Sequence, residues 1–165
     1  MKILITGGAG YIGSKLIGFL FQSSNDYHIT VYDNLMYNQM SLIQHIGNPN
    51  FKFIKGDVRD TNRLLKEVEK ADKVIHLAAW VGAPMCEDDP RGAAEVNQYS
   101  TEDIAQHLSP DQDIIYPMSN SGYGVGGEDF CTEESPLNPI SVYGTTKAES
   151  EKYVLGHPKS TVLRL

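Results

Sequence analysis

Apolar runs of strand length alternate with stretches of helical periodicity along the chain. Strands are expected over residues 2–6, 28–32, 51–54, 73–77, 113–118 and 160–165. Helices are expected over residues 11–22 and 61–69, where apolar positions recur at helical spacing. A long helix is expected over 90–108, where Pro90 can begin it, and another over 140–156, which is helical by composition. Strands that alternate with helices favour right-handed crossovers and a parallel sheet. The pattern predicts an α/β fold, a doubly wound parallel sheet with helices on both faces, forming one domain over residues 1–165.

Three details of this pattern bear on the connections. Residues 119–139 form a longer connection than a sheet needs, rich in Gly, Pro and acidic residues, which is typical of a functional loop. The run from Trp80 to Cys86 has no charged side chain, and we expect it to be a loop over the substrate. Thr61 is expected to cap the helix that it begins.

Composition and charge limit what the chain is expected to bind. The 165 residues are 41% hydrophobic and 21% charged, as in ordinary globular domains. The formal net charge of −7 and the scattered Lys and Arg residues predict no binding to nucleic acid or to anionic membranes. The first apolar run is one strand long and no run nears the roughly 18 residues of a membrane span, so neither a signal peptide nor a membrane segment is expected.

The two cysteines, Cys86 and Cys131, are too few for a disulfide framework. They also lack the spacing of zinc ligands, so we expect no metal site. This usage of cysteine favours a reducing compartment, and the predicted location is the cytoplasm.

A glycine-rich turn, Thr6-Gly-Gly-Ala-Gly-Tyr-Ile-Gly13, lies between the first strand and the first helix. Glycine lets the backbone turn sharply and approach a pyrophosphate, and the helix N-terminus offers free N–H groups. Asp33, 20 positions beyond Gly13, ends the second strand, where its carboxylate can accept from both ribose hydroxyls and repel a 2′-phosphate. These features predict a Rossmann-type site for NAD rather than NADP. The alternative is a surface turn with a capping Asp.

Two further strand ends face the same edge of the predicted sheet. Asp57 and Val58 follow the third strand and could flank adenine, although a plain turn is equally compatible with their position. Small residues after His76 would allow a cofactor to approach the end of the fourth strand closely. We interpret His76 itself as a core residue with satisfied hydrogen bonds.

Tyr143 and Lys147 are four residues apart and share a face of the last helix. A nearby ammonium favours the phenolate, so we expect the pKa of Tyr143 to be lowered. Tyr-x-x-x-Lys is a weak signal, and a second match, at Tyr11, is better interpreted as a pair on a helix surface. Ser119, just past the fifth strand, could bond the reacting oxygen; Ser121 is an alternative, and either could be a simple turn serine.

Together these motifs resemble the extended short-chain dehydrogenase/reductase family, specifically its nucleotide-sugar epimerases and dehydratases. The resemblance covers essentially the whole chain, through TGGAGYIG at 6–13, YDNL at 32–35, GDVRD at 56–60, HLAA at 76–79, Asn97, SNSGYG at 119–124 and SVYGTTKAESEKY at 141–153. It implies that Tyr143 is the general base, that Lys147 holds the nicotinamide ribose, and that Ser119 completes the triad. The implied contacts to NAD are Gly7, Gly10, Tyr11, Ile12, Gly13, Asp33, Asn34, Asp57, Val58, Leu77, Ala78, Ala79, Tyr143 and Lys147.

Two departures from the family qualify the expected activity. Family dehydratases carry an Asp-Glu pair after the triad Ser or Thr, whereas Asn120 and Ser121 stand here, which disfavours dehydration. Family members also continue into a smaller C-terminal domain that grips the nucleotide-sugar, and this chain ends at Leu165. We therefore expect that domain to be absent, and the chain alone to bind NAD but turn over nucleotide-sugars poorly.

The leading prediction is an NAD-dependent nucleotide-sugar epimerase, or its N-terminal part, that works through a transient ketone. The alternatives are a 4-ketoreductase or dehydratase of the same class, or a catalytically silent NAD-binding module. The resemblance also implies a homodimer through helices near 90–108 and 140–156. Val96, Ile104 and Leu108 could supply its apolar stripe, or could equally be ordinary core.

Overall fold

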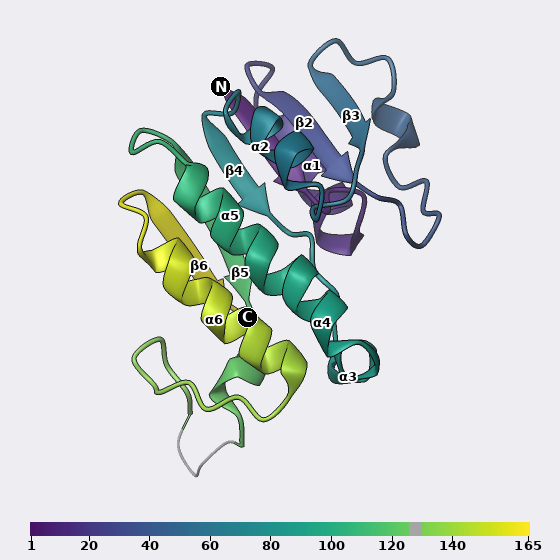
Figure 1. Ribbon diagram of the computed structural model, residues 1–165. Coiled ribbons are helices and arrows are strands. Elements are labelled where there is room, and N and C mark those ends of the chain that lie inside the picture. The colour runs from purple at the N-terminus through teal and green to yellow at the C-terminus, as the bar shows by residue number, and fades with distance from the viewer. Residues whose placement is uncertain (126–129) are drawn as a thin grey trace.

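The computed structural model describes residues 1–125 and 130–165, and it contains a six-stranded sheet whose neighbouring strands are all parallel (Figure 1). The strand order is β3-β2-β1-β4-β5-β6. The strands are β1 (Lys2–Thr6), β2 (His28–Asp33), β3 (Phe51–Lys55), β4 (Lys73–His76), β5 (Asp113–Met118) and β6 (Ser160–Arg164). Every strand predicted from the sequence is confirmed, with bounds that differ by one residue at most.

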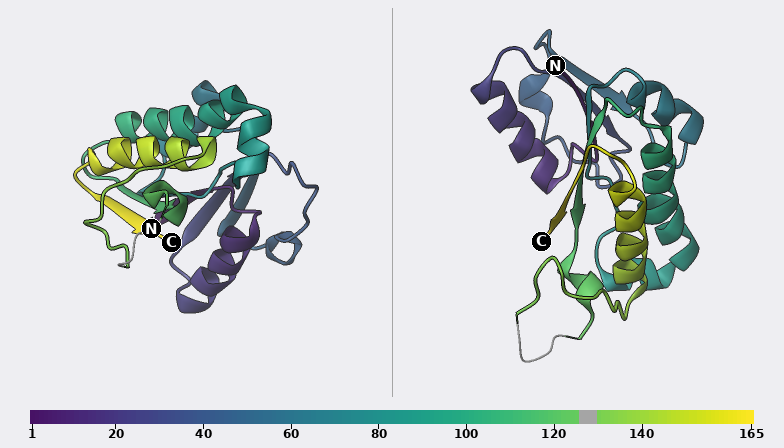
Figure 2. Two further views of the ribbon diagram at one scale, coloured as in Figure 1. Left: turned by 90° about the horizontal axis from the view of Figure 1, so that it is seen from below. Right: turned by 90° about the vertical axis from the view of Figure 1, so that its left-hand side faces the viewer.

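Helices cover both faces of the sheet, as predicted. Helix α1 (Tyr11–Ser23) lies on one face, and α2 (Thr61–Val68), α5 (Ser100–His107) and α6 (Val142–Leu155) lie on the other (Figure 2). Strand order reverses between β1 and β4, because the chain leaves β1 toward β2 and returns on its other side. Ligands of open α/β sheets bind at such a switch point, beyond the carboxyl ends of the strands.

The segment predicted as one helix over 90–108 has three parts. Helix α4 (Pro90–Ala93) begins at an Asp89 cap and passes into a π-helical stretch, η2 (Ala94–Tyr99), which continues into α5. Within η2 the Asn97 carbonyl accepts the Thr101 and Ser150 hydroxyls at 2.7 and 2.8 Å. Side-chain donors therefore satisfy this carbonyl within the wider turn.

Two local predictions were wrong. Asp60, not Thr61, caps α2, since its carboxylate accepts the Arg63 N–H at 3.3 Å. Thr61 instead donates its hydroxyl to Asp103 on α5 at 2.8 Å. The run from Trp80 to Cys86 is not simply a loop, because its second half opens helix α3 (Ala83–Asp88), where the Cys86 side chain is buried.

The long connection after β5 begins with a 3₁₀ turn, η3 (Asn120–Tyr123). A second short 3₁₀ turn, η1 (Ile43–His45), lies between β2 and β3. Residues 126–129, which belong to the predicted functional loop, lie outside the described residues. The remainder of that loop is irregular up to the Ser141 cap of α6.

The core divides into one cluster on each face of the sheet, because successive side chains of a strand point to opposite sides. Leu4 and Ile114 pack beneath α2, α5 and α6, whereas Ile3 and Ile5 pack against Ile17 of α1. The candidate dimer stripe belongs to the first cluster; its residues are at most 7% exposed, namely Val96, Ile104 and Leu108. The reading of these three as ordinary core is confirmed.

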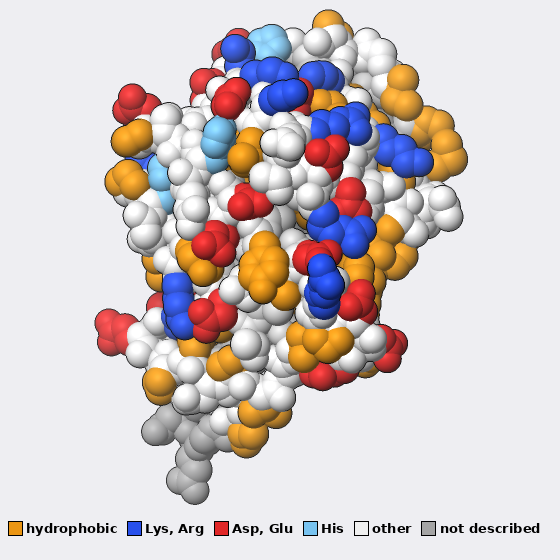
Figure 3. Space-filling model, viewed as in Figure 1, with side chains coloured by type: hydrophobic (Ala, Val, Ile, Leu, Met, Phe, Trp, Pro, Cys, Tyr) orange, Lys and Arg blue, Asp and Glu red, His pale blue; other side chains and the backbone are white. Residues whose placement is uncertain are grey.

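Charged side chains are interleaved on the surface rather than gathered by sign. Figure 3 shows Lys and Arg mainly over the upper half of one face, with Asp and Glu among them. Glu67 of α2 pairs with both Lys52 and Lys70, at 3.2 and 2.6 Å. Within the described residues, no helix is both long and apolar enough to cross a membrane.

Candidate active site

The glycine turn after β1 packs directly against the end of β4. Gly7 has a φ of +66°, and a Cβ there would lie 2.6 Å from the Ala78 backbone nitrogen. A Cβ at Gly13 would lie 2.5 Å from the Gly8 Cα. Neither position has room for a side chain, so the sequence brings bare backbone and the first turn of α1 to the switch point.

A cavity of about 520 Å³ opens at this edge of the sheet. It is lined by twelve of the residues that the sequence predicts for cofactor binding, namely Gly7, Gly10, Tyr11, Ile12, Gly13, Asp33, Asn34, Asp57, Val58, Leu77, Ala78 and Ala79. The structure thus brings together residues from four separate segments. Tyr143 and Lys147, the other two expected contacts, are not part of this lining.

Asp33 is held in place by two backbone donors. Its Oδ2 accepts the Ala9 N–H at 3.0 Å and its Oδ1 accepts the Leu35 N–H at 2.8 Å. The side chain is 7% exposed and ties the glycine turn to the end of β2. Each carboxylate oxygen has more than one lone-pair site, so the group can still accept from hydroxyls of a ligand in the cavity.

Asp57 carries a second fixed carboxylate at the same cavity. Arg59 donates to its two oxygens at 2.9 and 2.8 Å, and Asn34 Nδ2 donates at 3.2 Å. The hydrogen bonds from Arg59 are the main reason that the pKa of Asp57 lies well below its ordinary value. The carboxylate is therefore charged across the physiological range and remains an acceptor.

The first turn of α6 positions Tyr143. Ser141 caps the helix by accepting the Gly144 N–H at 3.0 Å, and Glu87 of α3 accepts the Val142 N–H at 2.9 Å. Ser119 lies at the end of β5 and bonds Ser121 through their hydroxyls at 3.1 Å. The Ser119 hydroxyl approaches Tyr143 closely enough to affect the pKa of the phenol. Two members of the predicted triad therefore meet.

The pKa of Tyr143 contradicts the expectation from sequence. Burial raises this pKa, and the contact with Ser119 opposes the rise only in part. Lys147 is not among the groups that shift it. The reason is geometric, because the Lys147 ammonium lies over the Tyr116 ring, 3.9 Å from its centroid. Burial in turn lowers the pKa of Lys147 to about 7.

Comparison with known proteins identifies the family of the chain. The family model for GDP-mannose 4,6 dehydratase matches residues 4–163. The chain belongs to the extended short-chain dehydrogenase/reductase family of nucleotide-sugar epimerases and dehydratases. The motifs that carry the resemblance are the same ones that line the cavity or surround Tyr143.

Relatives of both catalytic types share about a third of its residues. UDP-glucose 4-epimerase of Lactobacillus helveticus is 33% identical over 157 residues, covering 92% of this chain and 46% of the relative. Human dTDP-D-glucose 4,6-dehydratase is 33% identical over 159 residues, covering 93% and 45%. This member of the family thus spans about half the length of the curated relatives it matches.

Solved structures of the family show the same fold. The dTDP-glucose 4,6-dehydratase of Streptomyces venezuelae, with NAD and TYD bound, has a TM-score of 0.89 at 27% identity and covers 99% of this chain and 55% of its own. UDP-glucose 4-epimerase of Brucella ovis, in complex with NAD, has a TM-score of 0.83 at 30% identity, with coverage of 99% and 51%.

His76 is a core residue with hydrogen-bond partners, as predicted from the sequence. Its Nδ1 and the Thr6 hydroxyl are 2.6 Å apart, and its Nε2 lies 3.4 Å from the Ser100 hydroxyl. Burial lowers its pKa to about 3, so the ring is neutral at physiological pH. The imidazole is 1% exposed and links β1, β4 and α5 rather than the cavity.

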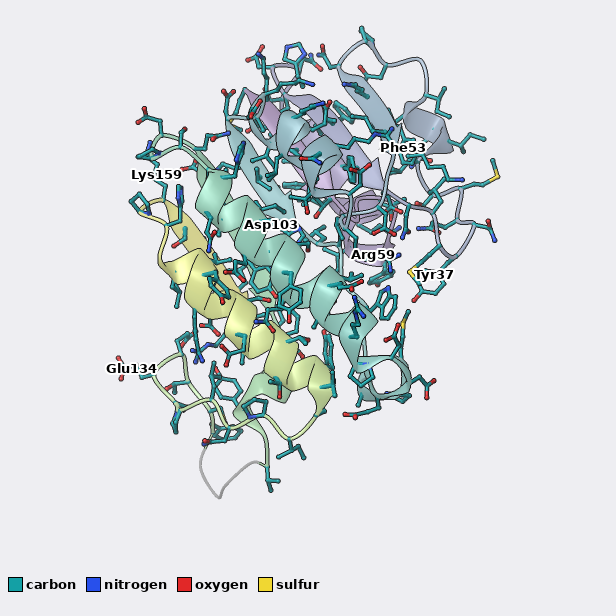
Figure 4. All side chains as sticks on the ribbon, in the orientation of Figure 1. Tyr37, Phe53, Arg59, Asp103, Glu134 and Lys159 are labelled. Carbon is teal, nitrogen blue, oxygen red and sulfur yellow. The ribbon has the colours of Figure 1, made fainter. Side chains whose placement is uncertain are left out.

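Met36 and Tyr37 line the cavity, although nothing in the sequence pattern pointed to them. Figure 4 shows Tyr37 and Arg59 on the same side of the molecule. Trp80 also lines the cavity, whereas the sequence placed it only in the expected substrate loop. Trp80 is fixed by Asn97, whose side-chain amide exchanges hydrogen bonds of 2.8 and 3.0 Å with the Trp80 backbone. The sequence marked Asn97 only as a residue shared with the family. Its role was not predictable, because its hydrogen-bond partner, Trp80, is 17 residues away in the sequence.

Proposed function

We propose that this chain binds NAD in the 520 Å³ cavity and acts in an NAD-dependent nucleotide-sugar epimerase. The observation that carries the proposal is Asp33, a carboxylate fixed beside a glycine turn that has no room for side chains. A dinucleotide needs an acceptor for its ribose hydroxyls and bare N–H groups for its pyrophosphate, and this edge of the sheet offers both. Solved family members bound to NAD support the choice of cofactor.

The buried carboxylate of Asp33 also selects against NADP. The 2′-phosphate of NADP would place a second negative charge beside the Asp33 carboxylate. The repulsion between these like charges is strong where water is excluded. Arg59 is held by Asp57 through two hydrogen bonds, which limits its use as a phosphate ligand.

The proposed chemistry assigns one task to each polar group. NAD held by Asp33 and the glycine turn would supply reversible hydride transfer at a sugar carbon. Tyr143 would take the proton of the sugar hydroxyl, and the Ser119 hydroxyl beside it would donate a hydrogen bond to the same oxygen. Lys147 would hold the nicotinamide ribose, and its positive charge would then favour the phenolate.

Epimerisation is favoured over dehydration by the residues of η3. Elimination of water from a sugar needs a carboxyl group or carboxylate as general acid and base close to the ketone. Residues Asn120 and Ser121 offer an amide and a hydroxyl there, and the Ser121 hydroxyl is bonded to Ser119. A 4-ketoreductase would use the same triad with exchange of the cofactor, and is the second candidate.

The first experiment measures cofactor binding. Trp80 is the single tryptophan of the chain and lines the cavity, so its fluorescence should be quenched on titration with NAD. We expect NADP to bind at least 10-fold more weakly, and Asp33→Asn to reduce this preference. Phe19→Ala, at an exposed position on the outer side of α1, is the control. Equal binding of NAD and NADP would contradict the proposal.

The second experiment separates an enzyme from a silent module. The chain is incubated with NAD and a panel of nucleotide-sugars, and absorbance at the wavelength of the reduced nicotinamide is followed. We expect slow reduction by at least one sugar, lost in Tyr143→Phe while NAD binding persists. Turnover as fast as that of a typical enzyme would contradict the expectation that the substrate site is incomplete. Reduction that survives in Tyr143→Phe would remove its role as base.

We also propose a homodimer through α5 and α6. These helices lie side by side on one face of the sheet, and no other described helix or strand covers their outer side (Figures 1 and 2). The interface cannot use Val96, Ile104 or Leu108, which are buried in the core. It would instead use exposed apolar side chains of the pair, such as Tyr99 of η2 and Leu155 of α6.

A further inference from the structure

Tyr116, a buried tyrosine of β5, lies beneath the Lys147 side chain although the proposed reaction does not use it. Tyr116 is 1% exposed and Lys147 is 4% exposed. The Lys147 ammonium lies 3.9 Å from the centroid of the Tyr116 ring, well within the range of cation–π contacts. The contact joins the middle strands of the sheet to the helix that carries Tyr143.

Hydrogen bonding by its hydroxyl does not explain why a tyrosine is buried at position 116. The hydroxyl oxygen is the one buried side-chain polar atom in the described residues that lacks a hydrogen-bond partner. The neighbouring hydroxyls of Thr101 and Ser150 donate instead to the Asn97 carbonyl. Burial also raises the pKa of Tyr116 well above its ordinary value, so the side chain is a neutral ring rather than a phenolate.

The titratable groups around Lys147 do not neutralise its charge. The imidazole of His76, on β4, stacks on the ring of Tyr116, with the two ring centroids 6.0 Å apart. This imidazole is neutral because burial depresses its pKa. On α6, Tyr143 is a neutral phenol and Glu151 is paired with Arg164 of β6 at 2.9 Å. Cys86 of α3 is a neutral thiol, since burial raises its pKa. The electron-rich face of Tyr116, 3.9 Å from the ammonium, is therefore a favourable partner for its charge.

We propose that Tyr116 is a positioning residue that holds the Lys147 ammonium against its ring face and helps to keep it charged in a buried site. On binding of cofactor, the Lys147 ammonium would then leave its contact with the Tyr116 ring for hydrogen bonds to the nicotinamide ribose hydroxyls. This inference deepens the proposed function, because the importance of the charge rests on the role assigned to Lys147 there.

The test is the titration of Lys147 itself, in the 165-residue chain without cofactor. Protein labelled with ¹³C-lysine is titrated by NMR, and the Lys147 Cε signal is identified by its loss in Lys147→Met. The wild-type signal should titrate near pH 7, far below the other lysines. Tyr116→Leu should lower this midpoint by about one pH unit, because the ring face is lost. Tyr116→Phe should leave it within about 0.3 units, because the ring is kept.

Controls distinguish the ring from general packing. Tyr99→Leu removes an exposed tyrosine of η2 and should not move the midpoint. If Tyr116→Leu does not fold, trifluorophenylalanine at position 116 keeps the ring shape while it weakens the negative face, and should again lower the midpoint. An unchanged or raised midpoint in folded Tyr116→Leu, or in the trifluorophenylalanine variant, would overturn the proposal, as would a shift in Tyr116→Phe equal to that in Tyr116→Leu. Because no cofactor is added, a failure of NAD binding leaves this result unaffected.

Discussion

Lys147 shows how far a single residue departs from its behaviour in water. Its ordinary pKa is 10.5, and burial lowers this to about 7 in the folded chain. Between these two values the unfolded state binds a proton that the folded state does not hold. Stability contributed by this residue must therefore rise with pH across that window, and below pH 7 the folded chain bears the full cost of a buried ammonium.

Lys147→Met should accordingly stabilise the protein at low pH. We expect its free energy of unfolding at pH 6 to exceed that of wild type by about 3 kcal/mol, because a buried charge is replaced by an apolar side chain of similar length. The gain should shrink above pH 7, by up to about 1.4 kcal/mol per pH unit, as folded wild type loses its proton. Urea denaturation at pH 6, 7, 8 and 9 measures this difference. A gain that is constant with pH would refute the assignment of the low pKa to Lys147.

At the scale of elements, the N-terminus of α6 does more than begin a helix. Its first turn is fixed by the Ser141 cap and by Glu87, which reaches Val142 from α3. Tyr143 lies within this turn, so the cap that stabilises the helix also fixes the proposed base. Asp60 caps the start of α2 in the same way, by accepting a backbone N–H, but α2 does not carry Tyr143.

This contrast gives a matched pair of variants. Ser141→Ala and Asp60→Ala should each lower the free energy of unfolding by about 1 kcal/mol, the ordinary cost of losing a cap. Only Ser141→Ala should also slow reduction of NAD by a nucleotide-sugar, by about 10-fold, since the Tyr143 hydroxyl loses its fixed position. Thermal unfolding and the absorbance assay measure the two effects. Equal loss of activity in both variants would indicate a general effect of stability.

At the scale of the whole molecule, the proposed dimer would use the outer side of η2, α5 and α6. Tyr99 is 51% exposed and Leu155 is 57% exposed, so both present apolar surface outside the core. On the opposite face, Phe19 of α1 is 66% exposed and offers a control of similar character. Burial of such side chains in an interface is favourable, and a charge introduced there is not.

Light scattering at micromolar concentration should therefore report a dimer. Tyr99→Glu combined with Leu155→Glu should shift the mass to that of a monomer, whereas Phe19→Glu should leave it unchanged. A wild-type monomer at these concentrations would count against the dimer, and dissociation by Phe19→Glu would place the interface on the wrong face.

The sequence alone determined the six strands, the parallel sheet and twelve of the residues around the cavity. The parallel sheet follows from the alternation of strands and helices. The glycine turn and Asp33 follow from local pattern, because the carboxyl ends of parallel strands meet at one edge. The full set of twelve residues came from the resemblance to the family, and the strand order was supplied by the structure.

Only the tertiary structure decided features that depend on a partner distant in the chain. Asp60 replaced Thr61 as a cap because Thr61 finds Asp103, 42 residues away. The helix over 90–108 widens at Asn97 because hydroxyls from α5 and α6 satisfy its carbonyl. Burial raises the pKa of Tyr143. Lys147 does not offset this rise, because its ammonium lies over Tyr116 of β5, which no spacing on α6 reveals. Periodicity fixes which residues share a face, whereas burial and the neighbour across the fold fix their chemistry.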